Sequence, residues 1–375
     1  MEGIAFSPSK AFKFNVNPYS KIHANQTPHL QTLTQISFRF SNPQSKPLLS
    51  FSINSTESTH TPITQSPPLV VVGSANADIY VEIDRLPAEG ETISAKNGQT
   101  LAGGKGANQA TCGAKLSYPT YFVGQVGDDA HGKLITQALG SGGVRLDYLK
   151  LLAGGVPTGH AVVMLQSDGQ NSIIIVGGAN MSSWPEQFSD QDLDVVKKAG
   201  IVLLQREIPD YVNIQVAKTA KSAGVTVIMD AGGMDAPMPQ ELLNFVDIFS
   251  PNESELGRLT GIPTENFEQI SQAAGKCHKM GVKQVLVKLG AKGSALFVEG
   301  EKPIRQSIIP AAQVVDTTGA GDTFTASFAV ALLEGKSKKE CLRFAAAAAS
   351  LCVQMKGAMP SMPNRKSVLN LLQSV

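Results

Sequence analysis

The hydrophobic pattern of the chain changes near residue 69. From "LVVVG" onward, short runs rich in β-branched residues alternate with stretches whose apolar positions recur every three or four residues. The runs predict strands and the spaced stretches predict helices. Continuous apolar strands separated by helices indicate a mostly parallel sheet that is covered on both faces. We therefore predict an α/β fold with a doubly wound sheet.

The alternation predicts individual elements across the middle of the chain. Besides the run at 69–73, the predicted strands are 120–124, 201–205, 225–230, 247–250 and 284–290. The predicted helices are 189–199, 211–223 and 266–280, and a long helix follows residue 322.

Two segments depart from this alternation. Residues 78–95 and 158–180 have the pattern of β-structure without an intervening helix, and Asp168-Gly169 in the second segment is a strong hairpin signal. A small separate sheet at the strand ends where ligands bind would act as a lid. We expect the lid strands at about 78–100 and 158–178.

The first 68 residues have a different composition from the rest. They hold eleven Ser, seven Thr, five Lys or Arg and only two acids, and they lack the continuous apolar core of a secretory signal. This composition is typical of an organelle transit peptide, and the Ser/Thr excess favours the chloroplast stroma over the mitochondrion. The alternative is a disordered tail without an address. We expect the folded domain to span 69–375.

Composition and charge limit the partners. With 375 residues and 42% apolar content, the chain can bury a full core. A net charge of +1 gives no sign of binding to nucleic acid or to an anionic membrane, and no apolar run is long enough to span a bilayer. Four cysteines without C-x-x-C spacing fit a reducing compartment and no structural zinc. We expect a small-molecule partner.

The stretch "VVDTTGAGDTFTASFAVALLEG" places small residues where an extended segment meets a helix. Gly319 and Gly321 precede Asp322, and the apolar spacing that starts at Phe324 predicts a helix with one buried face. A helix N-terminus attracts anions, and small residues let a phosphate approach. The alternative is that the glycines serve only the turn and the aspartate only the helix dipole.

The run "LAGGKGANQAT" is a second candidate site. Its glycines allow a ligand to approach the backbone, its lysine supplies a cation, and its asparagine offers both a donor and an acceptor, a combination that suits a polyhydroxyl ligand. Neither this run nor the GKS sequence at 335–337 has Walker A spacing, which argues against a classical P-loop kinase. The residues concerned are Gly103, Gly104, Lys105, Gly106 and Asn108.

Polar residues also follow two predicted strands. Asn76 and Asp78 come after the first strand, and Glu207 follows the strand at 201–205. Carboxyl ends of parallel strands meet at one edge of a sheet, so these groups are expected to line one crevice that binds sugar hydroxyls. Taken singly, Asp78 could be a turn former and Glu207 a surface charge.

Together, "GGKGANQA", the Asn76-x-Asp78 pair, "QREIP", "SPNESEL" and "DTTGAGDTF" resemble the ribokinase branch of the carbohydrate kinase family named after the minor phosphofructokinase. The resemblance covers about residues 69–375. It implies ATP-dependent phosphorylation of D-ribose at the 5-hydroxyl, with Mg²⁺ and with activation by K⁺.

The resemblance also implies site residues. Asp322 would be the base that takes the proton of the sugar hydroxyl, and the N–H groups of Gly319, Ala320 and Gly321 would form the anion hole for the transferred phosphoryl group, where positioning and electrostatics supply most of the catalysis. The sugar would be held by Asn76, Asp78, Gly104, Lys105, Gly106, Asn108 and Glu207.

The same resemblance implies nucleotide and cation sites. Asn252 and Glu255 would organise Mg²⁺ and the phosphates through waters, as suits an ion that dehydrates reluctantly. The nucleotide would be lined by Lys288, Gly290, Ala291, Lys292, Gly293 and Gly321. The K⁺ site would use side-chain oxygens of Asp316 and Ser361 and backbone carbonyls of Thr318, Cys352, Met355 and Gly357.

Several alternatives remain open. Ala346 offers no polar side chain where some relatives place one near the adenine, which leaves the nucleotide preference undecided. The acceptor could be another pentose, a nucleoside or a sugar phosphate, although only Arg85 and Lys96 could meet a substrate phosphate near the lid. A non-catalytic sugar-binding scaffold is a further alternative. The intact aspartate and anion hole argue against it, because a scaffold that had lost catalysis would be expected to have lost one of them. The small sheet predicts a homodimer formed through the lids.

Overall fold

The computed structural model describes residues 66–167 and 171–375, which belong to one compact unit. Its main sheet has nine strands in the order β13-β12-β11-β10-β9-β8-β1-β4-β5. The strands are β1 (Leu69–Val72), β4 (Thr120–Gly127), β5 (Arg145–Leu152), β8 (Ile201–Arg206), β9 (Thr226–Gly233), β10 (Ile248–Ser250), β11 (Gln284–Lys288), β12 (Ser294–Val298) and β13 (Ile304–Gln306).

The main sheet is mostly parallel, as the sequence predicts. Neighbouring strands pair in parallel from β5 across the sheet to β11, and β12 and β13 add an antiparallel edge. Each predicted strand is present, with ends that differ by a few residues. The sequence analysis did not predict β5, β12 or β13.

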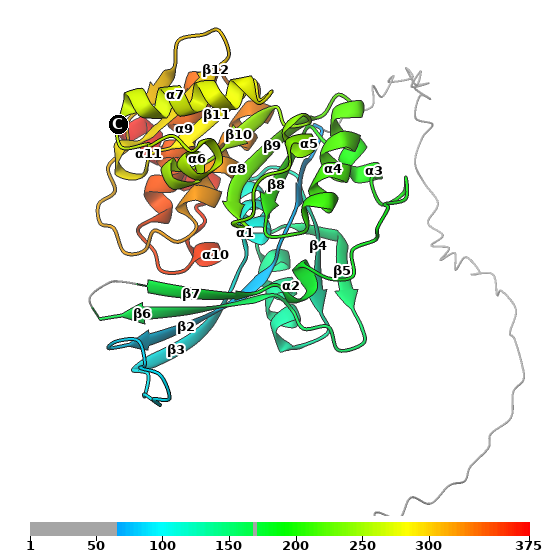
Figure 1. The fold of residues 1–375 in the computed structure, drawn as a ribbon, viewed down its shortest axis with the longest axis vertical. Helices are drawn as coiled ribbons and strands as arrows, with labels where there is room; N and C mark the ends of the chain where they lie inside the picture. Colours follow the sequence, from blue (N-terminus) through cyan, green and yellow to red (C-terminus); the bar gives the residue numbers. More distant parts are fainter. Residues whose placement is uncertain (1–65, 168–170) are drawn as a thin grey trace, which may run out of the picture. The chain divides into compact units, whose positions relative to one another are not determined.

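Helices cover both faces of this sheet (Figure 1). Leu69 and Val71 of β1 belong to the core on one face, whereas Val70 and Val72 belong to the core on the other, so both faces of the strand are buried. The first core includes α1 (Lys105–Lys115), α2 (Ala130–Ser141), α8 (Ala320–Leu333), α9 (Lys338–Cys352) and α11 (Arg365–Ser374). The second includes α3 (Asp194–Lys197), α4 (Asp210–Ser222), α5 (Gln240–Leu243), α6 (Glu253–Thr260) and α7 (Phe267–Lys279).

Capping residues in the sequence set several helix starts. The Asn266 side chain accepts a hydrogen bond from the Gln269 N–H at the start of α7, and Ser337 forms a capping box with Glu340 at the start of α9.

The helix predicted at 189–199 is wrong over most of its length, because only α3 is helical there. Helix α8 is buried on nearly every side rather than on one face, and the segment before Gly319 is a loop rather than a strand.

A second sheet has four strands in the order β3-β2-β6-β7. Pairs β2–β3 and β6–β7 are antiparallel and β2–β6 is parallel. Figure 1 shows this sheet beside the α/β body, near α10 (Ala358–Ser361). Its strands are β2 (Asn76–Ile83), β3 (Asn97–Gly103), β6 (His160–Gln166) and β7 (Asn171–Val176).

The small sheet confirms the β-structure that the sequence predicts at 158–180, and it corrects the boundaries of the first segment. Residues 84–96 lie in loops and turns, so the strand predicted through 78–95 ends at Ile83. The following strand, β3, includes Gly103 of the "LAGGKGANQAT" run and so extends beyond the expected limit of about residue 100. The proposed turn at Asp168-Gly169 lies outside the described residues, as do residues 1–65 of the proposed transit peptide.

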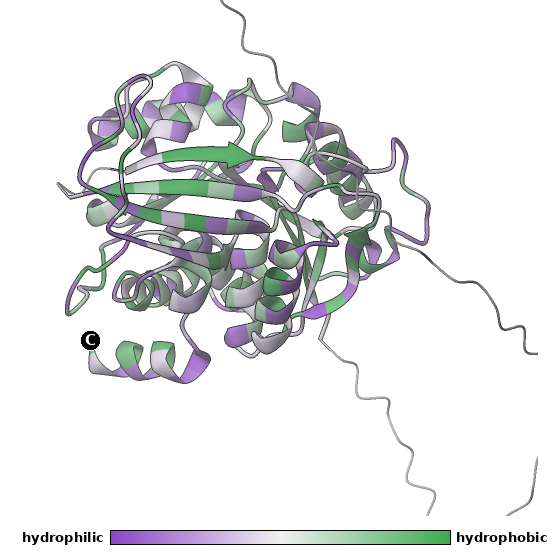
Figure 2. Cartoon of the chain, turned by 90° about the horizontal axis from the view of Figure 1, so that it is seen from below, coloured by the Kyte–Doolittle hydropathy of each residue, from purple (hydrophilic) through white to green (hydrophobic). Residues whose placement is uncertain are grey.

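In the part of the chain that the structure describes, no helix combines the length and the apolar character needed to cross a bilayer. All four cysteines are buried, and none forms a disulfide. Figure 2, seen from below, colours β7 as hydrophobic over most of its length. The most exposed apolar side chains of the small sheet are Ile173, Ile174, Ile175 and Val176 of β7.

Candidate active site

The candidate site lies at the carboxyl ends of the parallel strands. Strand β1 leads through 73–75 directly into β2, which begins at Asn76, and β8 is followed by Glu207. Strand β9 carries Asp230, and β11 ends at Lys288. Helices α1 and α8 begin near this edge, so their first turns bring Lys105, Asn108 and Asp322 to the same place. The polar groups predicted to converge at the strand ends therefore do converge.

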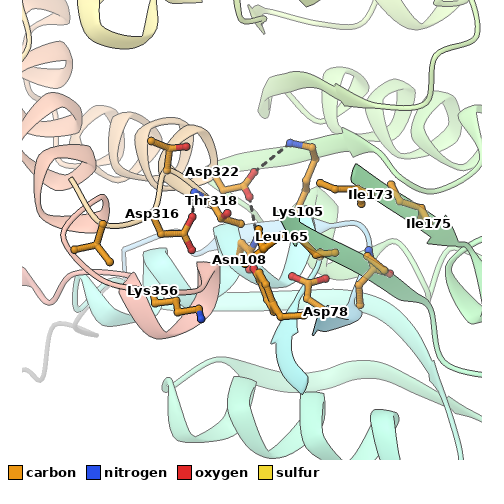
Figure 3. A pocket seen from close by; sticks show the side chains of 18 of the residues that line it. Asp78, Lys105, Asn108, Leu165, Ile173, Ile175, Asp316, Thr318, Asp322 and Lys356 are labelled. Carbon is orange, nitrogen blue, oxygen red and sulfur yellow. Dashed lines mark hydrogen bonds and ion pairs between the residues drawn. The ribbon is translucent and has the colours of Figure 1, made fainter. Parts of the chain in front are cut away.

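Asp322 lies in the first turn of α8 and is almost fully buried. Asn108 Nδ2 donates to Asp322 Oδ2 over 2.9 Å, and Lys105 Nζ lies 3.8 Å from Asp322 Oδ1. Figure 3 shows both side chains directed at the carboxylate. The aspartate is thus held by two residues of α1, which follow the glycines of the "GGKGANQ" run.

Burial and neighbouring charges shift the pKa values of the site. Burial raises the pKa of Asp322 above its usual range, and the nearby Lys105 ammonium opposes this change. The Asp322 carboxylate in turn raises the pKa of Lys105, so this lysine stays charged. Burial, followed by the charges of Glu207 and Asp322, raises the pKa of Asp78 to about 7. The site therefore contains carboxyl groups that gain protons more readily than free aspartates do.

The remaining sugar-site candidates are fixed by hydrogen bonds. Glu207 Oε2 accepts from Ser74 Oγ over 2.6 Å and from the Lys105 N–H over 3.1 Å. Asn76 Oδ1 accepts from Asn180 Nδ2 over 2.7 Å. Gly104 has φ 90°, and a Cβ there would lie 2.6 Å from the backbone nitrogen of Asn76, so glycine is required.

These residues line a pocket of about 680 Å³ between the main sheet and the small sheet. Its polar floor comes from the strand ends and from α1 and α8, and its opposite wall is apolar and comes from β6 and β7 (Figure 3). Ile173 and Ile175 on this wall are each more than half exposed. The small sheet thus supplies one wall of the pocket, in the position expected of a lid. The apolar wall residues are Ala161, Val163, Leu165, Ile173 and Ile175.

The start of α8 has the local geometry predicted for an anion site, with one difference. Gly319 is the N-cap residue with φ 79°, in the left-handed region that favours glycine. The Ala320 N–H donates to Thr317 O over 3.2 Å, so this one of the three predicted anion-hole donors is engaged within the loop. The first turn of any α-helix leaves other N–H groups without an intrahelical acceptor. A Cβ built on Gly321 would lie 3.9 Å from Lys288 Nζ.

The predicted nucleotide residues form a neighbouring cluster. Asn252 and Glu255 form a capping box at the start of α6, in which each side chain accepts from the other's backbone N–H over 2.8 Å. Lys288 pairs with Asn252 in an isolated bridge of the sheet, and Lys292 Nζ lies 3.0 Å from Glu253 Oε1. The short helix η2 (Gly290–Lys292) follows β11. These residues are close in space, but they do not line the 680 Å³ pocket.

Most of the predicted K⁺ residues also come together. Asp316 Oδ1 accepts from the Thr318 N–H and Oδ2 from the Gly357 N–H, over 2.9 and 2.8 Å. Burial opposes ionisation of Asp316, but these hydrogen bonds outweigh it and hold its pKa below the ordinary value. Cys352 Sγ lies 3.1 Å from Ser361 Oγ. The predicted ligand atoms for K⁺ are hard carboxylate, hydroxyl and carbonyl oxygens, which alkali cations prefer. The two Asp316 oxygens also accept hydrogen bonds from the Thr318 and Gly357 N–H groups.

Three further positions named from the sequence do not line this pocket. Gly106 packs under the strand turn, where a Cβ would lie 2.7 Å from the Ser74 nitrogen, and it does not line the pocket. The Met355 side chain is half exposed. Ala346 is buried in the core of α9.

Four residues of the site were not identified from the sequence. Asp230 forms an ion pair with Lys288 over 2.7 Å, and Gln109 donates to Asp322 Oδ1 over 3.2 Å. Asn180 orients Asn76, and Tyr80 on β2 lines the pocket with a buried hydroxyl that has no partner among the described residues. The signal for Asp230 was its place at the end of a predicted strand, the criterion that identified Glu207.

Comparisons with known proteins identify the family of the chain. The sequence profile of the pfkB family carbohydrate kinases matches residues 67–365. The chain is 68% identical to a ribokinase of Arabidopsis thaliana over 100% of this chain and 99% of the relative, and 35% identical to a ribokinase of Haemophilus influenzae over 81% and 98%. A solved structure of Arabidopsis thaliana ribokinase complexed with ribose and ATP matches with a TM-score of 0.80 and 78% identity, over 82% of this chain and 99% of that one. The chain therefore belongs to the pfkB family of carbohydrate kinases.

Proposed function

We propose that this chain is a ribokinase, which transfers the γ-phosphoryl group of ATP to the 5-hydroxyl of D-ribose and releases ADP and ribose 5-phosphate. The observation that carries the proposal is the buried Asp322 carboxylate, held by Asn108 and Lys105 beside a pocket that also contains Asp78 and Glu207. The similarity to a ribokinase whose structure holds ribose and ATP supports the same assignment.

Asp322 is proposed to act as the general base. Its carboxylate accepts the proton of the 5-hydroxyl while the hydroxyl oxygen forms a bond to the γ-phosphorus and the bond from phosphorus to the ADP oxygen breaks. The N–H groups at the start of α8 face developing negative charge, and the small residues there allow the phosphoryl group to approach. The Lys105 ammonium keeps Asp322 ionised more readily than burial alone would allow.

The charges of the pocket favour a neutral acceptor over a sugar phosphate. Four carboxyl groups, those of Asp78, Glu207, Asp316 and Asp322, line the pocket and would repel a second phosphate. Lys356 lines the pocket as well, but its Nζ pairs with Glu82 Oε1 over 2.6 Å. A neutral pentose meets these carboxylates with its hydroxyl donors. Another pentose or a nucleoside remains the second candidate, because the apolar wall from β6 and β7 could also accept a base.

Mg²⁺ and K⁺ are part of the proposal. The Glu255 carboxylate keeps lone pairs beyond the one used in the capping box, which suits water-mediated contact with Mg²⁺, whereas Asn252 Oδ1 accepts from both the Glu255 N–H and Ser254 Oγ. The ion would neutralise charge on the transferred phosphates. Asp316, Ser361 and the backbone carbonyls of Thr318, Cys352, Met355 and Gly357 would hold K⁺ near the start of α8. Among the described residues, no cluster of three or more His, Cys, Asp or Glu side chains suits a transition metal.

We also propose a homodimer formed through the small sheets and a chloroplast location. Exposed apolar side chains on β7, at the edge of a four-stranded sheet, support packing against a second copy. Light scattering of the 69–375 chain that gave a monomer mass at micromolar concentration would contradict the dimer. Fusion of residues 1–68 to a fluorescent protein tests the location, and fluorescence that stays outside plastids would contradict it.

The function is tested with a panel of acceptors. Protein that starts near Pro68 is assayed with ATP and ribose, fructose, adenosine, pseudouridine or fructose 6-phosphate, in K⁺ or Na⁺, beside Asp322→Asn. We expect turnover largely confined to ribose, higher in K⁺ and nearly abolished in the variant. Phosphorylation of another acceptor in place of ribose would reassign the substrate. Absence of turnover with every acceptor would favour the alternative that the chain is a non-catalytic sugar-binding scaffold.

A further inference from the structure

A second buried carboxylate lies close to Asp322. Asp230 at the end of β9 is 1% exposed. Its oxygens accept hydrogen bonds from Lys288 Nζ over 2.7 Å, from Thr325 Oγ1 over 2.9 Å and from the Gly232 N–H over 3.0 Å. Burial opposes ionisation, but Lys288 and the other donors outweigh it and hold the pKa of Asp230 below its ordinary value. A fixed negative charge therefore lies beside the proposed base.

Gln109 lies between these two carboxylates. Its Nε2 is 3.2 Å from Asp322 Oδ1 and 3.5 Å from Asp230 Oδ2, and its Oε1 accepts from Gln205 Nε2 over 2.7 Å. The side chain is completely buried. Because an ionised carboxylate only accepts hydrogen bonds, the NH₂ group of Gln109 must face the two aspartates and its carbonyl must face Gln205. Gln205 thus fixes the amide in the orientation that both aspartates require.

We propose that Gln109 is a positioning residue for Asp322, which fixes the second oxygen of the base and separates it from Asp230 through a shared NH₂ donor. This inference rests on the proposed function. Asn108 fixes Asp322 Oδ2 and Gln109 fixes Oδ1, so the orientation of the carboxylate is determined from two sides. Without the shared donor, the two buried carboxylates would have only the Lys105 charge in common, and protonation of one of them would be more favoured.

The network reaches from the sugar side of the site to the nucleotide side. Lys288, the cation partner of Asp230, is near the Gly321 backbone at the start of α8.

A pH experiment must consider every charged or titratable group around Asp322. These groups are Lys105, Asp230, Glu207, Asp78, Lys288, Cys112 and Cys352.

Three variants test this role. Gln109→Leu keeps the volume and removes the donor, and Gln109→Glu offers a donor only while the introduced carboxyl is protonated. Gln125→Leu is the matched control, since Gln125 is also fully buried and donates from Nε2 to a backbone carbonyl, that of Ser182 over 3.2 Å, outside the pocket. Ribose and ATP kinetics are measured from pH 5 to 9, together with the midpoint of thermal unfolding.

For Gln109→Leu we expect kcat to fall about 10- to 100-fold with KM for ribose changed less than about twofold. The acid limb of kcat should move up by about one pH unit, because the carboxylate loses a hydrogen bond that stabilises its charged form. Gln109→Glu should be most active at low pH and lose activity as the introduced carboxyl ionises. Gln125→Leu should keep the wild-type pH profile.

Two results would overturn the role. One is a folded Gln109→Leu variant with wild-type kcat and acid limb, and the other is an equal loss in Gln109→Leu and Gln125→Leu without any shift in pH profile. If Gln109→Leu shows no cooperative unfolding, Gln109→Glu decides, and activity that rises with pH as in the wild type contradicts the proposal. Wild-type protein that ignores ribose would contradict the proposed function instead, and the variants would then be assayed with the accepted acceptor.

Discussion

Asn180 Nδ2 donates to Asn76 Oδ1 over 2.7 Å, and Asn180 Oδ1 accepts from the Ala75 N–H over 2.9 Å. Asn180 follows β7, whereas Asn76 begins β2, so one buried amide connects the far end of the small sheet to the first residue of the proposed sugar site. A Cβ built on Gly159 would lie 2.0 Å from Asn180 Nδ2, which shows how closely the chain packs around this amide.

We expect Asn180→Leu to weaken both the fold and sugar binding. Losing the amide leaves buried groups of Ala75 and Asn76 unpaired, at a cost of about 2–4 kcal/mol in the free energy of unfolding, and frees the Asn76 side chain to turn away. KM for ribose should rise about tenfold or more. Ser182→Ala, which removes a hydroxyl bonded to Gly178 O nearby, is the control for urea denaturation and kinetics. Unchanged KM in a folded Asn180→Leu protein would argue against the role.

The buried Asp78 carboxylate is expected to lower stability at high pH while it supports ribose binding. Its folded pKa of about 7 lies above the ordinary value of 3.8, so its contribution to stability is present at low pH and is lost as pH rises through about 7. Asp78→Asn removes the buried charge, and we expect the variant to be about 2–4 kcal/mol more stable than the wild type at pH 8 but not at pH 4. Ribose phosphorylation should fall sharply.

The measurement for Asp78 is urea denaturation without ligands at several pH values. Asp84→Asn is the control, because Asp84 lies on the surface of the small sheet and its pKa is lowered by Lys96, so it stays ionised from pH 5 to 8. A wild-type stability that does not fall between pH 5 and 8 relative to Asp78→Asn would contradict the shift.

Gly104 offers a paired test of backbone geometry. Gly104→Ala must place a Cβ 2.6 Å from the Asn76 nitrogen at φ 90°, whereas Gly154→Ala carries a similar φ of 86° with nothing within 4 Å. Both should lose about 1 kcal/mol to the left-handed conformation. Only Gly104→Ala should lose more stability than this and lose ribose turnover. Equal stability and activity in the two variants would show that the close approach to Asn76 does not matter.

Tyr80→Phe tests the unpartnered hydroxyl in the pocket. Burial, followed by the charges of Asp78 and Asp316, raises the pKa of Tyr80 to about 12, so the hydroxyl remains a donor throughout the working pH range. We expect the variant to be as stable as the wild type, because it loses no hydrogen bond among the described residues, and KM for ribose to rise about three- to tenfold. Tyr118→Phe, which loses a hydrogen bond to Pro67 O, should be less stable than the wild type and keep its KM for ribose.

The sequence predicted the layers and the polar strand ends because both follow from local patterns. A run such as "LVVVG" has no solvent-facing position, and a carboxylate that directly follows a strand of this kind, as Glu207 follows Ile201–Arg206, lies at the sheet edge. The pattern of residues 84–95 alternates as in a strand, but Pro87 and Gly90 favour turns there. The strand therefore ends at Ile83 in the structure.

Gln109 and Asn180 could not be predicted for a different reason. In the sequence, Gln109 looks like any polar residue of a helix, and its partners Gln205, Asp230 and Asp322 lie far along the chain. Only the packing of α1 against α8 and against the main sheet, where β8 carries Gln205 and β9 carries Asp230, brings these side chains within hydrogen-bonding distance. The capping box of Asn252 and Glu255, by contrast, is local and was readable from the spacing N-x-x-E before an apolar residue.

The position of β1 also determines the order in which the sheet can be completed during synthesis. Leu69–Val72 leave the ribosome before every other described strand, yet their partners are Thr120–Val123 on one side and Ile201–Leu204 on the other. A fully apolar segment must therefore wait about fifty residues for its first partner, and its other edge stays unpaired until more than a hundred further residues have been made. This chain is accordingly expected to need protection by chaperones until β8 emerges.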